Sequence, residues 1–155
     1  MILQTAGLGD LEIDESLIIT FPEALPGFPE EHKFVLIPLD NNSPFYYLQS
    51  VLTKELCLIV ADPFVFFTDY EIELDKESLQ KLEIIDEKTN FILYCILTIP
   101  EDFKKTTANL LGPVIINGDK KIGLQFIAQN YDYTTKHFIF PQNAGKLESA
   151  AREGL

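Results

Sequence analysis

A chain of 155 residues with 46% hydrophobic content is long enough to bury one core and too apolar to stay disordered. Its formal net charge of −12 opposes direct binding to nucleic-acid phosphates and favours basic protein partners. No apolar run reaches the roughly 20 residues of a membrane-spanning helix, and the first residues lack the basic start of a signal peptide, so we expect neither.

In the first third of the chain, short apolar runs separated by turn residues predict strands. Residues 2–13 predict a hairpin that turns at Gly7 to Asp10. Further strands are expected at residues 18–21, before Pro22, at residues 34–37, before Pro38, and at the aromatic run 45–51. The three prolines and one glycine between Pro22 and Pro29 predict an irregular loop.

The stretch from Leu56 to Asp75 predicts two strands separated by a turn at Asp62-Pro63. The run from Leu56 to Ala61 is apolar at every position, so we expect it in the middle of a sheet. After the turn, acidic residues from Asp69 to Asp75 alternate with apolar ones, which predicts carboxylates on one face of a strand. This stretch contains no Lys or Arg, so its negative charge is clustered.

The second half of the chain predicts one helix among further strands. Asp75 can cap a short helix whose Leu79 and Leu82 share one face. Strands are expected at residues 91–99, 108–116 and 122–128, the last two joined around Asn117-Gly118, a strong hairpin signal. Pro113 inside this hairpin predicts an edge or a bulge. Residues 131–140 predict a last strand or an extended arm.

Many short strands with one helix predict an all-β fold, a small, closed or nearly closed antiparallel β-barrel-like domain. Residues 1–141 are expected to form this single domain. Residues 142–155 predict a frayed tail, a weak helix or a remnant of cloning. Cys57 and Cys95 both lie in apolar runs, so buried free thiols in a cytoplasmic protein are favoured over a disulfide or a zinc site.

The sequence contains no pattern typical of a catalytic site, and we predict no enzymatic activity, metal or cofactor. His32 and His137 lack metal-ligand spacing, and no glycine-rich phosphate loop is present. Asp62 and Asp69 would serve as an acid and a base only if burial raised the pKa of one of them, whereas acidic residues on an alternating strand are more often solvated.

The aromatic residues around this acidic stretch allow two interpretations. In one, Phe45, Tyr47, Phe64 and Phe66 fill the barrel and their neighbours cover its outside. In the other, some of the outward-facing rings form a protein-binding patch rimmed by Asp62, Asp69 and Glu71. The sequence alone leaves both open for any one ring.

Five segments, in order, resemble the family of the bacterial flagellar assembly factor FliW. They are residues 21–28 (FPEALPGF), 42–50 (NSPFYYLQS), 61–71 (ADPFVFFTDYE), 99–102 with 107–113 (IPED and TANLLGP), and 131–137. The resemblance implies a small cytoplasmic β-barrel-like protein without enzymatic activity. It further implies two competing partners, flagellin and the carbon storage regulator CsrA, a small RNA-binding dimer that represses flagellin translation.

Together, the residue pattern and the resemblance predict a regulator that acts by exclusive binding, as a monomer because its net charge opposes self-association. The predicted contact residues are Phe45, Tyr46, Tyr47, Asp62, Pro63, Phe64, Phe67, Asp69, Tyr70 and Glu71, with Asn109 and His137 added on family motifs that a purely structural role would also explain. The alternatives are a barrel that binds a small molecule or acts as an enzyme through its surface carboxylates, and a chaperone for several exported subunits.

Overall fold

The structure is a computed structural model that describes residues 1–86, 88–129 and 132–142. Its strands are β1 (Ile2–Thr5), β2 (Gly9–Glu12), β3 (Ile19–Thr20), β4 (Lys33–Pro38), β5 (Phe45–Ser50), β6 (Cys57–Ala61), β7 (Phe91–Thr98), β8 (Thr107–Asn117), β9 (Ile122–Gln125) and β10 (His137–Phe138). Its α-helices are α1 (Pro63–Phe66) and α2 (Lys76–Lys81), and single 3-10 turns occur at Glu15–Leu17 and Phe103–Lys105. In the described part of the chain, no helix has the length and apolarity to span a membrane.

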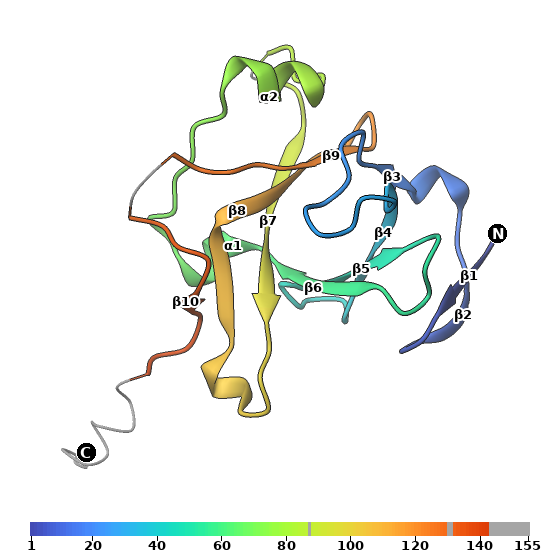
Figure 1. The fold of residues 1–155 in the computed structure, drawn as a ribbon, viewed down its shortest axis with the longest axis horizontal. Helices are drawn as coiled ribbons and strands as arrows, with labels where there is room; N and C mark the ends of the chain where they lie inside the picture. Colours follow the sequence, from blue (N-terminus) through green and yellow to red (C-terminus); the bar gives the residue numbers. More distant parts are fainter. Residues whose placement is uncertain (87, 130–131, 143–155) are drawn as a thin grey trace.

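Seven strands close a barrel in the order β8, β7, β6, β5, β4, β3 and β9, with β9 returning to β8 (Figure 1). All pairings are antiparallel except the one between β3 and β9, which are parallel and meet only at Thr20 and Ile122. Strand β10 pairs with the first residues of β8, outside the closure. The predicted all-β barrel is therefore confirmed.

One hydrophobic core fills the inside of the barrel. Phe21, Phe34, Leu48, Val60 and Val114 are fully buried there, each contributed by a different part of the barrel wall. The rings of Phe21 and Phe34 pack edge to face, with centroids 5.4 Å apart. Alternate residues of each strand point into this space, and the residues between them face outward.

A second core lies on the outside of the same wall. Buried residues of β7 and β8, including Cys95, Leu97 and Leu110, pack there against Tyr70 and Leu82. We call the segments that cover this face, residues 62–84 and the described part of residues 126–140, the covering layer. Because the β6–β8 wall has a core on each face, its strands are apolar at nearly every position, as the sequence predicted for residues 56–61.

The β8–β9 hairpin forms where Asn117-Gly118 predicts it. The Asn117 side chain is fully buried, and its Oδ1 accepts hydrogen bonds from the backbone nitrogens of Asp119 (3.1 Å) and Lys120 (3.2 Å). Pro113 lies in a bulge, as expected, since the β7–β8 register jumps from Ile96↔Asn109 to Tyr94↔Val114. The hairpin and the bulge thus follow from local turn chemistry.

The predicted strand after Pro63 is absent from the structure, and this expectation is wrong. Asp62 is the N-cap of α1, because its Oδ1 accepts from the Phe64 nitrogen at 2.9 Å, and Pro63 occupies the first turn. After α1 the chain is irregular until Asp75, which caps α2 as predicted by accepting from the Ser78 nitrogen at 2.7 Å. The Asp-Pro pair starts a helix here as well as ending a strand.

The two cysteines are free thiols, as expected, but only one is buried. Burial raises the pKa of Cys95 to about 12, so its thiol stays protonated. Cys57, by contrast, is exposed at the start of β6, so the predicted burial of this thiol is wrong. Cys57 is the first residue of β6 and lies at the rim of the barrel, where apolar neighbours in the sequence do not guarantee that a side chain is buried.

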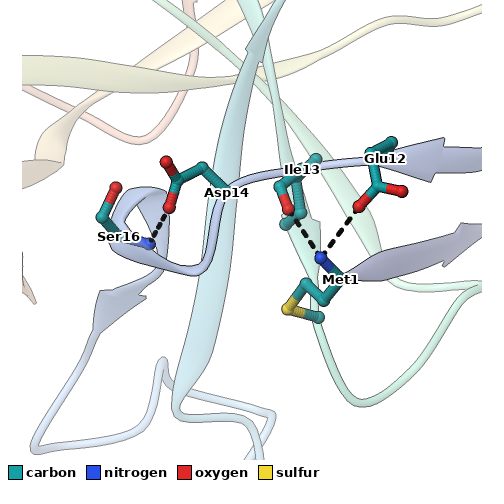
Figure 2. A network of polar contacts seen from close by, with 5 residues as sticks. All are labelled: Met1, Glu12, Ile13, Asp14 and Ser16. Carbon is teal, nitrogen blue, oxygen red and sulfur yellow. Dashed lines mark hydrogen bonds and ion pairs between the residues drawn. The ribbon is translucent and has the colours of Figure 1, made fainter.

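The two ends of the described chain lie far from each other (Figure 1). The β1–β2 hairpin forms as predicted, and the Met1 nitrogen bonds Glu12 Oε2 and the Ile13 carbonyl, both at 2.9 Å (Figure 2). Just beyond, Asp14 Oδ1 accepts from the Ser16 nitrogen at 2.9 Å. The C-terminal arm, residues 132–142, contains the short β10. Of the predicted tail, residues 142–155, only Gln142 belongs to the described residues.

Candidate protein-binding surface

Residues 69–75, which we call the acidic segment, alternate in burial although they form no strand. Tyr70, Ile72 and Leu74 pack into the outer core, and the four acidic residues between and beside them are exposed. An extended chain points successive side chains in opposite directions whether or not it is paired in a sheet. The predicted separation of carboxylates from apolar side chains is therefore confirmed, without the predicted strand.

Two tyrosines hold the acidic segment in place. Tyr70 Oη donates to the Leu110 carbonyl in the β8 bulge at 2.7 Å, and Tyr133 Oη, from the C-terminal arm, accepts from the Glu71 nitrogen at 2.8 Å. Their rings pack edge to face with centroids 4.8 Å apart. Burial raises the pKa of Tyr70, which keeps its hydroxyl protonated and able to donate. The segment is thus fixed by side chains and not by a ladder of backbone bonds.

Replacing Tyr70 by phenylalanine is expected to lower the free energy of unfolding by about 1–2 kcal/mol, because the buried Leu110 carbonyl loses its donor. Urea denaturation measures the change. Tyr47→Phe is the matched control, since this ring is only half-buried. An equal effect in both variants would show that the hydrogen bond contributes nothing to stability.

An open groove of about 800 Å³ lies beside the acidic segment. Its floor is apolar and is formed by Tyr70, Ile72, Leu74, Leu79, Phe91 and Leu93. Glu71, Glu73 and the half-exposed Phe64 also line it. The groove therefore combines an apolar floor with carboxylates, contributed by the acidic segment, α2 and the start of β7.

A smaller hollow of about 470 Å³ shares Tyr70 with the groove as a lining residue. Phe67, Asp69, Tyr133 and His137 are among its walls. His137 Nε2 accepts a hydrogen bond from the Thr134 nitrogen at 2.8 Å, which requires the proton to be on Nδ1. Burial lowers the pKa of His137, so its ring is neutral at pH 7.

Half of the predicted contact residues come together at these two spaces. They are Phe64, Phe67, Asp69, Tyr70, Glu71 and His137. Sequence reasoning missed Leu79, Phe91 and Tyr133, which reach the surface from other parts of the chain. The sequence did contain a signal for two of them. Leu79 lies on the apolar face of the predicted helix, and Phe91 is the first residue of the predicted strand 91–99.

The other predicted contact residues lie elsewhere. Tyr46 points into the barrel and packs on Tyr94, while Phe45 packs on Phe66 outside it. Thus none of Phe45, Tyr47, Phe64 and Phe66 belongs to the barrel interior, and the interpretation in which these four fill the barrel is wrong. In strand β5, Tyr46 faces the barrel interior, whereas that interpretation placed Phe45 and Tyr47 there.

Asp62, Pro63 and Asn109 have structural roles in the described residues. Asp62 and Pro63 begin α1, and Pro63 is buried. Asn109 Oδ1 accepts from the Gly112 nitrogen at 2.8 Å and so stabilises the β8 bulge. Within the described part of the chain, no group of three or more His, Cys, Asp or Glu side chains is placed to hold a metal ion.

Comparison with known proteins places this architecture in one family. The family model described as FliW protein matches residues 2–139. The chain is 50% identical over 150 residues to the flagellar assembly factor FliW of Syntrophomonas wolfei, covering 95% of this chain and 96% of that protein. It is 43% identical over 139 residues to the protein of the same name from Bacillus subtilis, covering 90% and 96%.

A solved structure agrees with these matches. The crystal structure of a flagellar assembly factor FliW superposes with a TM-score of 0.85 at 44% sequence identity, covering 92% of this chain and 99% of the other. Sequence and fold thus give the same assignment along nearly all of the chain. The chain belongs to the FliW family, whose named relatives are flagellar assembly factors.

Proposed function

We propose that this protein is a non-catalytic, cytoplasmic regulator of flagellar assembly that binds flagellin and, alternatively, the translational repressor CsrA. Binding of CsrA would relieve repression of flagellin translation, and binding of flagellin would release CsrA. Family membership supports the role in assembly. One observation supports the surface: the acidic segment presents its carboxylates beside an open groove with an apolar floor.

The groove has the chemistry that an amphipathic segment requires. An apolar helix face or extended strand would cover the floor at Ile72, Leu74 and Phe91, while polar residues would stay at the rim. A terminal segment of flagellin is the proposed occupant. Burying the partly exposed ring of Phe91 provides the affinity, because removal of apolar surface from water is the main favourable term.

The carboxylates of Asp69, Glu71 and Glu73 provide the attraction for CsrA. All three are exposed, and no Lys or Arg occurs between Asp62 and Asp75. A basic RNA-binding protein is steered toward such a surface at a rate that falls with ionic strength. One surface with both features explains how two chemically different partners exclude each other.

Reversing the charge of Asp69 and Glu71 together, with Asp69→Lys and Glu71→Lys, is expected to weaken CsrA binding by about tenfold or more and to flatten its salt dependence. The matched control reverses Asp10 and Glu55, two exposed carboxylates away from the groove. Both double variants change the net charge by the same amount. Titration calorimetry over a series of salt concentrations measures both quantities.

Equal losses of CsrA affinity in the two double variants would mean that only the net charge of the protein matters. This surface would then no longer be assigned as the binding site. Unchanged affinity in the Asp69/Glu71 variant would have the same consequence. Because both side chains are exposed, circular dichroism should show an unchanged fold. The same titrations with flagellin, followed by competition with CsrA, test the exclusive binding.

A further inference from the structure

The smaller hollow is lined largely by aromatic rings. The rings of Phe67, Tyr70, Tyr133 and His137 surround it, and Asp69 and Asp132 also line it. Ring centroids lie 6.0 Å apart between Phe67 and His137 and 6.2 Å apart between Tyr133 and His137. Both pairs meet edge to face. No Lys or Arg is among the described residues that line the hollow.

Asp69 brings a negative charge to this hollow, and the described residues do not neutralise it. The Asp69 carboxylate is exposed, and in the described residues no basic side chain pairs with it. His137 adds an aromatic wall without a positive charge, because its Nε2 accepts from Thr134. Aromatic faces and carboxylates around a space with no cation of its own have the chemistry of a cation receptor.

We infer that this hollow is a subsite for one arginine side chain of a protein partner, with the guanidinium against the rings and paired with Asp69. Arginine fits better than lysine because its planar group packs on aromatic rings, is more weakly hydrated and bonds a carboxylate through two parallel N–H groups. The inference rests on the proposed function for the partner that supplies the arginine, but the hollow can be tested without that partner.

His137 couples this subsite to pH. Protonation of the ring would put a second cation in the hollow and remove the acceptor of the Thr134 bond. The charged and titratable groups facing the ring are Asp69 from the turn after α1, and Asp132 and Tyr133 from the arm. Tyr70 lines the same space, Leu110 of β8 carries no charge, and Lys136 is its exposed neighbour in the chain. A guanidinium and a proton on His137 therefore compete.

The sign of this competition is fixed by the direction of the His137 shift. Burial lowers its pKa below the ordinary value of 6.5, so the ring is neutral and the subsite is available above that pH. Arginine affinity should be constant there and should fall once the pH drops through the pKa of the folded protein. Reciprocally, bound arginine should lower the pKa of His137 further.

The test is a nuclear magnetic resonance titration of the full chain with N-acetyl-arginine amide at constant ionic strength. We expect saturable shifts of the Tyr133 and His137 ring signals, weaker binding of N-acetyl-lysine amide, and a His137 titration midpoint that moves to lower pH at saturation. Asp69→Asn should abolish the saturable shifts. Glu55→Gln, at an exposed carboxylate that lines neither the hollow nor the groove, is the matched control and should leave them unchanged.

Shifts that do not saturate, that sodium chloride reproduces, or that persist unchanged in Asp69→Asn would overturn the inference. The backbone spectrum of each variant shows whether the fold is retained, and both replaced side chains are exposed. Failure of the proposed function is read separately, in the CsrA and flagellin titrations, because the arginine amide needs neither partner.

Discussion

Replacing Asn117 by alanine is expected to lower the free energy of unfolding by about 3 kcal/mol, because one buried side chain satisfies four backbone groups. Its Nδ2 donates to the carbonyls of Leu82 (2.7 Å) and Glu83 (3.4 Å), and its Oδ1 accepts from Asp119 and Lys120. It therefore joins the end of α2 to the β8–β9 turn. Alanine would leave the innermost of these groups without partners.

Urea denaturation of Asn117→Ala measures this loss, and Asn90→Ala is the control. Asn90 is also an asparagine near the hairpin, where its backbone carbonyl accepts from the Gly118 nitrogen at 3.1 Å, but its side chain is exposed. The control should change stability by no more than about 0.5 kcal/mol. A loss at Asn117 as small as the control would mean that water replaces the side chain without cost.

Replacing Gly123 by alanine is expected to cost about 2–3 kcal/mol through overpacking of the barrel interior. A Cβ at this position would lie 2.5 Å from Cζ of Phe21, closer than real contacts allow. The Phe21 ring is fully buried and packs against Phe34, so it has little room to move. Glycine is required at position 123 because the Phe21 ring lies so close to its backbone, and not because the backbone has an unusual conformation.

A double-mutant cycle separates this clash from other causes. Phe21→Leu alone should destabilise by leaving a cavity, but combined with Gly123→Ala it should cost clearly less than the sum of the two single changes. Gly7→Ala is the control for adding a methyl group, since nothing lies within 4 Å of a Cβ there. Strict additivity in the cycle would show that the ring does not limit the size of residue 123.

The strands of the barrel could be predicted from the sequence, because the patterns that specify them are local. Short apolar runs separated by turn residues predicted every barrel strand to within a few positions, and Asn117-Gly118 predicted the β8–β9 hairpin. Closure through β3 and β9 was not accessible. It depends on one parallel pair, Thr20↔Ile122, between segments about a hundred residues apart in the chain, and no local pattern specifies such a contact.

The candidate surface was only partly accessible, for two physical reasons. Phe45, Tyr46 and Tyr47 are three adjacent aromatic residues, so hydrophobic contrast does not show which of them faces the core. Three phenylalanines in the run 64–67 also favoured a strand, whereas the Asp62 cap and Pro63 start α1. The groove needs Phe91 of β7 beside Ile72 and Leu74, a proximity that only the folded chain creates.

The wall with a core on each face gives the molecule two levels of protection against amide hydrogen exchange. The barrel strands are tied by ladders on both sides, so their amides should exchange only through global unfolding. The acidic segment is fastened by the side chains of Tyr70 and Tyr133 and not by such a ladder, and so should lift away in smaller, more frequent openings. The part of the molecule that carries the proposed binding surface is therefore also the part that can rearrange while the barrel stays intact.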